Sequence, residues 1–208
     1  MAQGPSARTK EELVKEFRTG EILRAARQVI AELGLGEASM ERIAQGAGIS
    51  KGTIYLYFQN KEQLLLRAVQ QAFEELMARL EGAVAGASLA PERLRALVQS
   101  SLSHAGENRG FFRALMEPRG LGLESVSELA RRFAAQNEQY VAFVASIVEE
   151  GARNGEFRDL PPRLVAVALS GALRGAIAER IASGASGDLD RDTNTILDLL
   201  LHGVIGKR

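Results

Sequence analysis

The chain has 208 residues, of which 46% are hydrophobic and 25% charged, the proportions of an ordinary globular protein. Lysine and arginine number 26 together, as do aspartate and glutamate, so no basic excess marks the chain as a nucleic-acid binder. The chain has no cysteine, and its two histidines, His104 and His202, lie far apart, which argues against a disulfide framework or a metal centre. It has no long apolar run and no apolar N-terminal signal region, so we expect a cytoplasmic protein without a membrane partner.

The N-terminal residues 1 to 9 show no apolar period, and we expect them to form a mobile arm. Arg8 and Lys10 could reach phosphates or a minor groove, as such arms do in some DNA-binding folds. A plain disordered terminus is the alternative. From about Lys10 to Leu33 an apolar stripe predicts a helix, which the glycines at positions 34 and 36 should end.

Residues 39 to 61 divide into two short helical pieces around a Gly-Ala-Gly turn. Ser39 is placed to cap the first piece, and Ser50 is placed to cap the second. Ile54 and Phe58 lie four residues apart in the second piece, so both should face a core. This order of helix, glycine turn and capped helix is typical of a helix-turn-helix, in which the second helix enters a DNA major groove.

The outward side chains of this segment predict the DNA contacts. The residues that begin the second piece should meet base edges, because that end of the helix does so in this motif. Two tyrosines and a lysine that follow carry donors for phosphate oxygens. The alternative is a surface helical hairpin whose tyrosines pack for stability. The predicted DNA-binding residues are Ser39, Arg42, Ser50, Lys51, Gly52, Thr53, Tyr55, Tyr57 and Lys61.

The string at residues 48 to 64 reads Gly-Ile-Ser-Lys-Gly-Thr-Ile-Tyr-Leu-Tyr-Phe-Gln-Asn-Lys-Glu-Gln-Leu. It closely resembles the DNA-binding signature of the TetR (tetracycline-repressor-like) family of bacterial transcription regulators. The resemblance covers about residues 20 to 70. It implies a three-helix DNA-binding domain over residues 1 to 64 and a helical effector-binding and dimerisation domain over residues 65 to 208. No cofactor is expected.

The second half of the chain predicts helices only, since it has no strand-period segment and no internal repeat. The fold should therefore be all-α, with about nine helices. Glycine and proline clusters separate the expected helices. These cover about residues 61 to 82, 91 to 105, 111 to 117, 124 to 153, 162 to 183 and 189 to 205.

The last two predicted helices look too apolar for the surface of a monomer, and the first of them is rich in alanine and glycine. Paired with the same helices of a second chain, they would form a four-helix bundle, which is also the arrangement of the family. Alternatively, they only cover the core of one chain. A two-fold dimer presents two reading helices, so the operator should be a near-palindrome in double-stranded DNA.

The resemblance also implies an effector pocket in the second domain. An apolar pocket with a few polar groups suits an apolar or amphipathic effector, such as an acyl chain or a drug-like compound. The alternative is that the same aromatics are plain core. The predicted lining is Leu102, Phe111, Phe112, Met116, Phe133, Tyr140, Phe143 and Ile177. The predicted polar groups are His104, Arg113, Gln136, Asn137 and Arg174, of which the arginines could hold a carboxylate or a phosphate.

These features predict a ligand-responsive DNA-binding regulator, a repressor that its effector releases from the operator; activation is the alternative role. An architectural DNA-binding protein without an effector is a second class, but dimerisation alone would not need so large a second half. An all-α enzyme is a third class, and it would need a nucleophile, a base and an orienting group. The chain has no cysteine and neither histidine lies in a catalytic motif, so we predict no enzyme and no catalytic residue.

Overall fold

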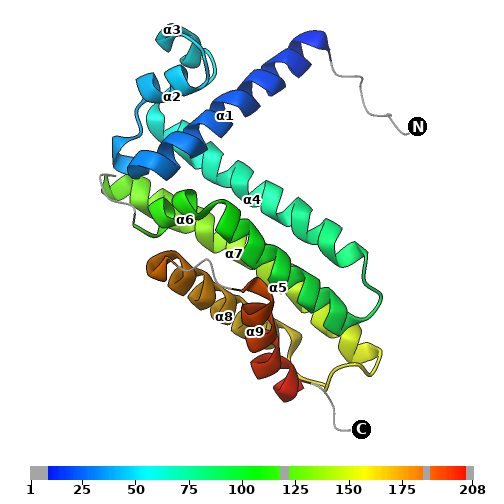
Figure 1. The fold of residues 1–208 in the computed structure, drawn as a ribbon. Coiled ribbons are helices and arrows are strands. Elements are labelled where there is room, and N and C mark those ends of the chain that lie inside the picture. Colours follow the sequence, from blue (N-terminus) through cyan, green and yellow to red (C-terminus); the bar gives the residue numbers. More distant parts are fainter. Residues whose placement is uncertain (1–8, 118–121, 185–187, 205–208) are drawn as a thin grey trace, which may run out of the picture.

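The computed structural model describes residues 9–117, 122–184 and 188–204, which form nine helices and no strand (Figure 1). The all-α prediction is confirmed for these ranges. None of the helices in them is long and apolar enough to cross a membrane. The predicted arm up to Arg8 and the turn at Gly120 lie outside the described residues, as do the side chains after Leu200. The helices are α1 (Lys10–Glu37), α2 (Met40–Gly46), α3 (Lys51–Ile54), α4 (Lys61–Ala85), α5 (Ala90–Glu107), α6 (Arg109–Met116), α7 (Leu123–Arg153), α8 (Pro162–Ser183) and α9 (Leu189–Val204).

Side-chain caps begin the first four helices. Thr9 and Glu12 form a capping box at the start of α1. Ser39, Ser50 and Asn60 each accept a hydrogen bond from the amide three residues on, and so begin α2, α3 and α4. The predicted caps at Ser39 and Ser50 are therefore confirmed.

The end of α1 differs from the prediction. Gly34 takes a left-handed conformation, with φ of 83°, but the chain resumes helical geometry and continues to Glu37. The amide of Ala38 then donates to the Gly34 carbonyl at 3.3 Å. Gly34 therefore kinks the helix instead of ending it, because the residues after it still find helical hydrogen-bond partners.

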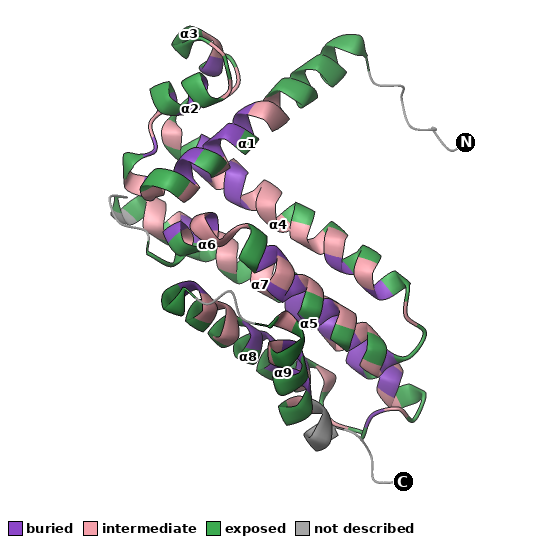
Figure 2. Cartoon of the chain, viewed as in Figure 1, coloured by how far each residue is buried: buried purple, intermediate pink, exposed green. Residues whose placement is uncertain are grey.

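Two clusters of buried apolar side chains hold the fold together. Figure 2 marks the buried positions along each helix in purple. The first joins α1, α2, α3 and the start of α4, and it also contains Phe111 and Ala114 of α6 and Leu129 of α7. The second joins the end of α4 with α5, α7, α8 and α9. Helix α4 runs through both clusters, so it connects the N-terminal helices to the body (Figure 1). The division at residues 64 and 65 remains a prediction.

Helix α6 packs unusually closely on α1. A Cβ atom placed on Gly110 would lie 2.9 Å from the Ala31 carbonyl oxygen and 3.0 Å from the Ala31 Cβ. Real Cβ contacts are rarely this short, so the absence of a side chain at Gly110 permits the approach. The neighbouring Phe111 then reaches the first cluster.

We expect Gly151→Ala to destabilise the fold, because the added Cβ would lie 2.5 Å from the Phe157 ring and 2.7 Å from the Ala90 Cβ. Overpacking of this kind costs about 1–3 kcal/mol of unfolding free energy, measurable by urea denaturation. The matched control is Gly82→Ala, in α4, where nothing lies within 4 Å of the added atom. That change should stabilise the chain by about 0.5–1 kcal/mol. Equal unfolding free energies for the two variants would contradict the close approach.

Candidate functional site

The helix-turn-helix turns at Gly48, whose φ of 66° favours glycine. The Ile49 amide donates to a carbonyl of α2 at 3.0 Å and closes the turn. Helix α3 covers a single turn, after which the amides of Tyr57 and Phe58 both donate to the Ile54 carbonyl at 3.0 Å. Ile54 and Phe58 are buried, as predicted, so the core holds the last residue of the short helix and the turn that follows it.

Four predicted DNA-binding residues gather at the start of α3. Lys51 and Gly52 are exposed, and Thr53 is half-buried. Ser50 accepts a hydrogen bond from the Thr53 amide at 3.1 Å, and the two hydroxyl oxygens lie 2.8 Å apart. The start of α3 is therefore a rigid, polar and accessible end of a helix.

Four more predicted residues lie at the start of α2 and in the turn after α3. Ser39 accepts from the Arg42 amide at 3.3 Å, and the Arg42 side chain is exposed. Tyr55 is 45% exposed, which places it on the surface side of the turn. Tyr57 packs partly against the first cluster and lines a groove between α1 and the turn after α3.

Lys61 makes a contact that the sequence pattern did not predict. Its Nζ donates to the Gly36 carbonyl at 2.7 Å, in a half-buried position. Carbonyls at the C-terminal end of a helix lack helical partners and attract cations. Lys61 therefore ties the start of α4 to the end of α1.

Glu41 of α2 forms an ion pair with Lys51, and both side chains are more than half exposed. The hydrogen bond from Lys51 lowers the pKa of the Glu41 carboxyl, and the same bond raises the pKa of Lys51. Lys51 is thus charged and already has an acidic partner. Sequence reasoning missed Glu41, because the contact depends on the angle between α2 and α3.

A cavity of about 320 Å³ lies between α4, α5, α6, α7 and α8. Five of the eight residues predicted to line the effector pocket do line it, namely Phe111, Phe112, Phe133, Tyr140 and Ile177. Three of the five predicted polar groups, Gln136, Asn137 and Arg174, line it as well. Sequence reasoning missed the contribution of α4 and two serines. The full lining is Val69, Ala72, Phe73, Leu76, Ser101, Phe111, Phe112, Leu115, Phe133, Gln136, Asn137, Tyr140, Ser170, Leu173, Arg174 and Ile177.

Three predicted lining residues do not line this cavity. Leu102 is 1% exposed and belongs to the second cluster, because it lies one position past Ser101, which faces the cavity from α5. Phe143 packs partly against the same cluster. Met116 is 45% exposed at the end of α6.

Two of the predicted polar groups also lie outside the lining. His104 is buried behind Phe112, and the two rings meet edge-on with their centroids 6.0 Å apart. Burial lowers the pKa of His104. Arg113 is exposed and faces a groove at the end of α1. Neither residue can therefore meet an effector in this cavity without a rearrangement.

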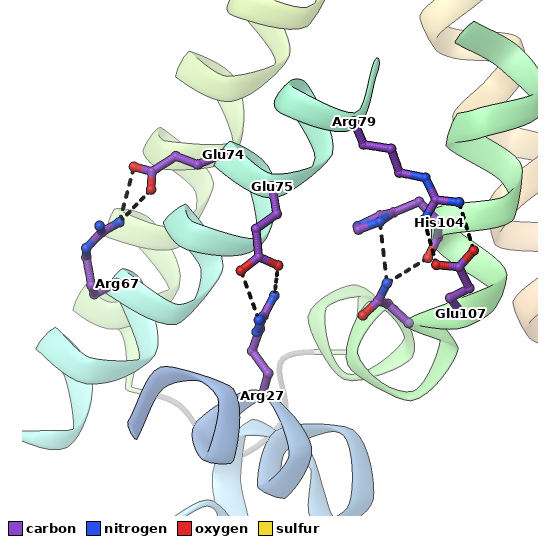
Figure 3. A network of polar contacts seen from close by, with 8 residues as sticks. Arg27, Arg67, Glu74, Glu75, Arg79, His104 and Glu107 are labelled. Atoms are coloured by element: carbon purple, nitrogen blue, oxygen red, sulfur yellow. Dashed lines mark hydrogen bonds and ion pairs between the residues drawn. The ribbon is translucent and has the colours of Figure 1, made fainter. Parts of the chain in front are cut away.

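Ion pairs hold α4 to α1 and to α5 (Figure 3). Arg27 of α1 donates to both carboxylate oxygens of Glu75 of α4, at 2.5 and 3.0 Å. One helical turn along α4, Arg79 donates to Glu107 of α5 at 2.6 and 2.8 Å. The bond from Arg79 lowers the pKa of Glu107 to about 2. Helix α4 is thus held to α1 on one side and to α5 on the other.

Comparison with known proteins identifies the family. Residues 22–68 match the family described as bacterial regulatory proteins, tetR family, and residues 87–178 match a tetracyclin repressor-like C-terminal domain. The fatty acid metabolism regulator protein of Bacillus subtilis (strain 168) is 29% identical over 189 residues, which cover 90% of this chain and 95% of the relative.

Two solved structures share the fold. The fatty acid degradation regulator FadR of Bacillus halodurans has a TM-score of 0.77 and 25% identity, over 94% of this chain and 97% of its own. FadR of Bacillus subtilis in complex with stearoyl-CoA has a TM-score of 0.76 and 27% identity, over 88% of this chain and 98% of its own. With both of its halves matched, this chain belongs to the TetR family and is a ligand-responsive DNA-binding transcription regulator.

Proposed function

We propose that this chain is a dimeric repressor that releases its operator when a long-chain acyl compound occupies the cavity between α4, α5, α6, α7 and α8. One observation carries the proposal: the apolar cavity shares a wall with the core of the N-terminal helices. Phe111 lines the cavity and also belongs to the first cluster. A molecule that fills the cavity therefore touches the packing of the DNA-binding helices. An architectural protein would have no use for such a cavity.

The start of α3 is the proposed reading surface. Lys51, Gly52 and Thr53 would face base edges in a major groove, because they lead the exposed end of the second helix. Arg42 and Tyr55 are also exposed and would bind phosphates. Tyr57 would also contact phosphates, and Lys61 would do so with the ammonium N–H groups that the Gly36 carbonyl leaves free. Ser39 and Ser50 would contribute through the helix starts that they cap.

An acyl compound is the proposed effector, because most of the cavity wall is aromatic or aliphatic. The relative from Bacillus subtilis whose structure contains stearoyl-CoA supports a fatty acyl-CoA in particular. Coupling would pass through α6, which touches α1 at Gly110, and through α4, which Glu75 ties to Arg27. A regulator that binds the chromosome would act in the bacterial cytoplasm.

The proposed dimer forms through α8 and α9. Their outer faces expose Leu164, Val167 and Leu199, at 64%, 43% and 78%. Gly171 and Gly175 of α8 have no neighbour within 4 Å of an added Cβ, so a second helix could approach this face closely. Covering these apolar residues with the same face of a second copy gives the two-fold symmetry that a palindromic operator requires.

The direct test is binding of the purified chain to DNA from upstream of its own gene, with stearoyl-CoA and unacylated coenzyme A as competitors. We expect tight binding to one near-palindromic stretch, steeply weakened by salt because phosphate contacts release counterions. Stearoyl-CoA should release the DNA, whereas coenzyme A should not. Equal, weak binding to all fragments, or binding that no acyl compound changes, would contradict the proposal.

We expect Glu41→Gln to strengthen binding to any DNA duplex, because Lys51 then loses its competing carboxylate. An exposed ion pair is worth about 0.2–1 kcal/mol, so affinity should rise roughly 1.5- to 5-fold. Fluorescence anisotropy would measure it. Glu37→Gln, a second exposed carboxylate of the same N-terminal helices, is the matched control. The gain in DNA affinity should vanish when Lys51 is also replaced by Ala. A gain that persists in this double variant would refute competition between Glu41 and DNA for Lys51.

Gly110→Ala should weaken the communication between cavity and operator, because the added Cβ pushes α6 away from the Ala31 carbonyl. Allosteric coupling is typically about 1–3 kcal/mol, which corresponds to a roughly 5- to 150-fold change in operator affinity on effector binding. We expect this ratio to fall several-fold in the variant. The control is Gly106→Ala in α5, where nothing lies within 4 Å. An unchanged ratio in Gly110→Ala would show that the contact carries no coupling.

A further inference from the structure

The polar groups of the cavity lie on one side of it. The contributions of α4 and α6 are entirely apolar, whereas α5, α7 and α8 supply every polar lining residue. The polar members are Ser101, Gln136, Asn137, Tyr140, Ser170 and Arg174. An effector in this cavity therefore meets a hydrocarbon surface on one side and hydrogen-bonding groups on the other.

Tyr140 has a hydroxyl that needs a partner. The residue is only 8% exposed, and its oxygen makes no hydrogen bond of normal geometry within the described chain, although the Ser101 hydroxyl lies close enough to affect its pKa. The neighbouring Ser101 donates its own proton to the Leu97 carbonyl at 2.8 Å. Burial raises the pKa of the Tyr140 phenol, so the group stays protonated and is available as a donor. A buried donor without an acceptor is costly, and an acceptor on an effector would remove that cost.

Arg174 stands at the exposed side of the same polar wall. Its Nη1 donates to the Asn137 Oδ1 at 2.6 Å, and the Ser170 hydroxyl donates to the same oxygen at 3.2 Å. Asn137 lies three residues before Tyr140 on α7, so both project from one face of the helix. The Asn137 contact therefore holds the guanidinium beside the cavity, and its other N–H groups can face an anion.

The opposite end of the cavity is apolar and adjoins the N-terminal helices. Phe111 and Leu115 of α6 and Phe133 of α7 all lie in or against the first cluster. Phe133 precedes Tyr140 by seven residues, or about two turns of α7. The cavity thus has a hydrocarbon end near the first cluster and a polar end about 10 Å away along α7, at a rise of ~1.5 Å per residue.

We propose that the effector places an acyl carbonyl oxygen on the Tyr140 hydroxyl and its anionic group beside Arg174, with its hydrocarbon tail against α6. This assignment rests on the proposed function and adds the orientation of the ligand. A free carboxylate satisfies this chemistry with a single group, whereas an acyl-CoA satisfies it when its pantetheine arm, which separates the thioester from the phosphates, folds back toward Arg174. In either case the tail, and not the head group, presses on the helix that contacts α1.

The test is direct ligand binding by the full-length protein in the absence of DNA, measured by calorimetry. Stearoyl-CoA is compared with its octadecyl thioether analogue, which lacks only the carbonyl oxygen, in the wild type and in Tyr140→Phe. We expect the wild type to prefer the carbonyl compound about tenfold, the scale of one buried hydrogen bond. Tyr140→Phe should bind the two equally. In the second arm, the affinities for stearic acid and for stearoyl-CoA are each compared between the wild type and Arg174→Gln. If the substitution weakens binding of stearic acid more, Arg174 binds a carboxylate. If it weakens binding of stearoyl-CoA more, Arg174 binds the phosphates.

Thr193→Val supplies a matched control, since Thr193 is another buried hydroxyl that finds no hydrogen-bond partner among the described residues but lies outside the cavity lining. It should leave both affinities unchanged. Without ligand, Tyr140→Phe should melt no lower than the wild type, because it removes an unsatisfied group; a lower melting temperature would mean that the hydroxyl is structural. Equal wild-type affinities for the thioester and the thioether would overturn the carbonyl contact while leaving an acyl-CoA effector in place. No binding of any of the three ligands by the wild type would overturn both.

Discussion

The close packing of α6 on α1 is the constraint on which the functional arrangement depends. Because Gly110 has no side chain, α6 can lie against the Ala31 backbone and insert Phe111 into the core of the N-terminal helices. The same helix turns Phe111, Phe112 and Leu115 toward the cavity. A packed interface of this kind cannot deform continuously, so a change of cavity contents favours one discrete packing over another.

Helix α4 is the second connection between the cavity and the N-terminal helices. Its ion pairs position the helices more than they stabilise the fold. Its first residues help to form one cluster and its last residues the other. The Arg27–Glu75 pair fixes its angle to α1, and the Arg79–Glu107 pair fixes its angle to α5. Partly exposed pairs of this kind contribute little net free energy of folding. Their bidentate geometry does, however, fix the orientation of the two helices that they join. Breaking such an ion pair and forming another therefore costs little free energy. A regulator that changes between two arrangements of its helices requires this.

The sequence correctly predicted the features that depend on residues close together in the chain, such as helix caps and the turn between α2 and α3. Capping serines, a glycine turn and the spacing of Ile54 and Phe58 determine α2 and α3 within a few residues of chain. The cavity was predicted only in part, because it depends on which face each helix turns inward. Leu102 and Ser101 are neighbours in sequence, yet only the serine faces the cavity. The Glu41–Lys51 pair and the Lys61 contact with Gly36 likewise follow from angles between helices, which no short pattern encodes.

The central claim is that filling the cavity changes the arrangement of the DNA-binding helices through α6. The chain has no cysteine, so a single Gln45→Cys substitution on the exposed side of α2 allows unique spin labelling. The measurement is the label-to-label distance across the proposed dimer, by pulsed electron paramagnetic resonance, with and without stearoyl-CoA. The account predicts that the ligand shifts the distance distribution and that Gly110→Ala reduces the shift. Saturation with ligand that leaves the wild-type distribution unchanged would contradict it.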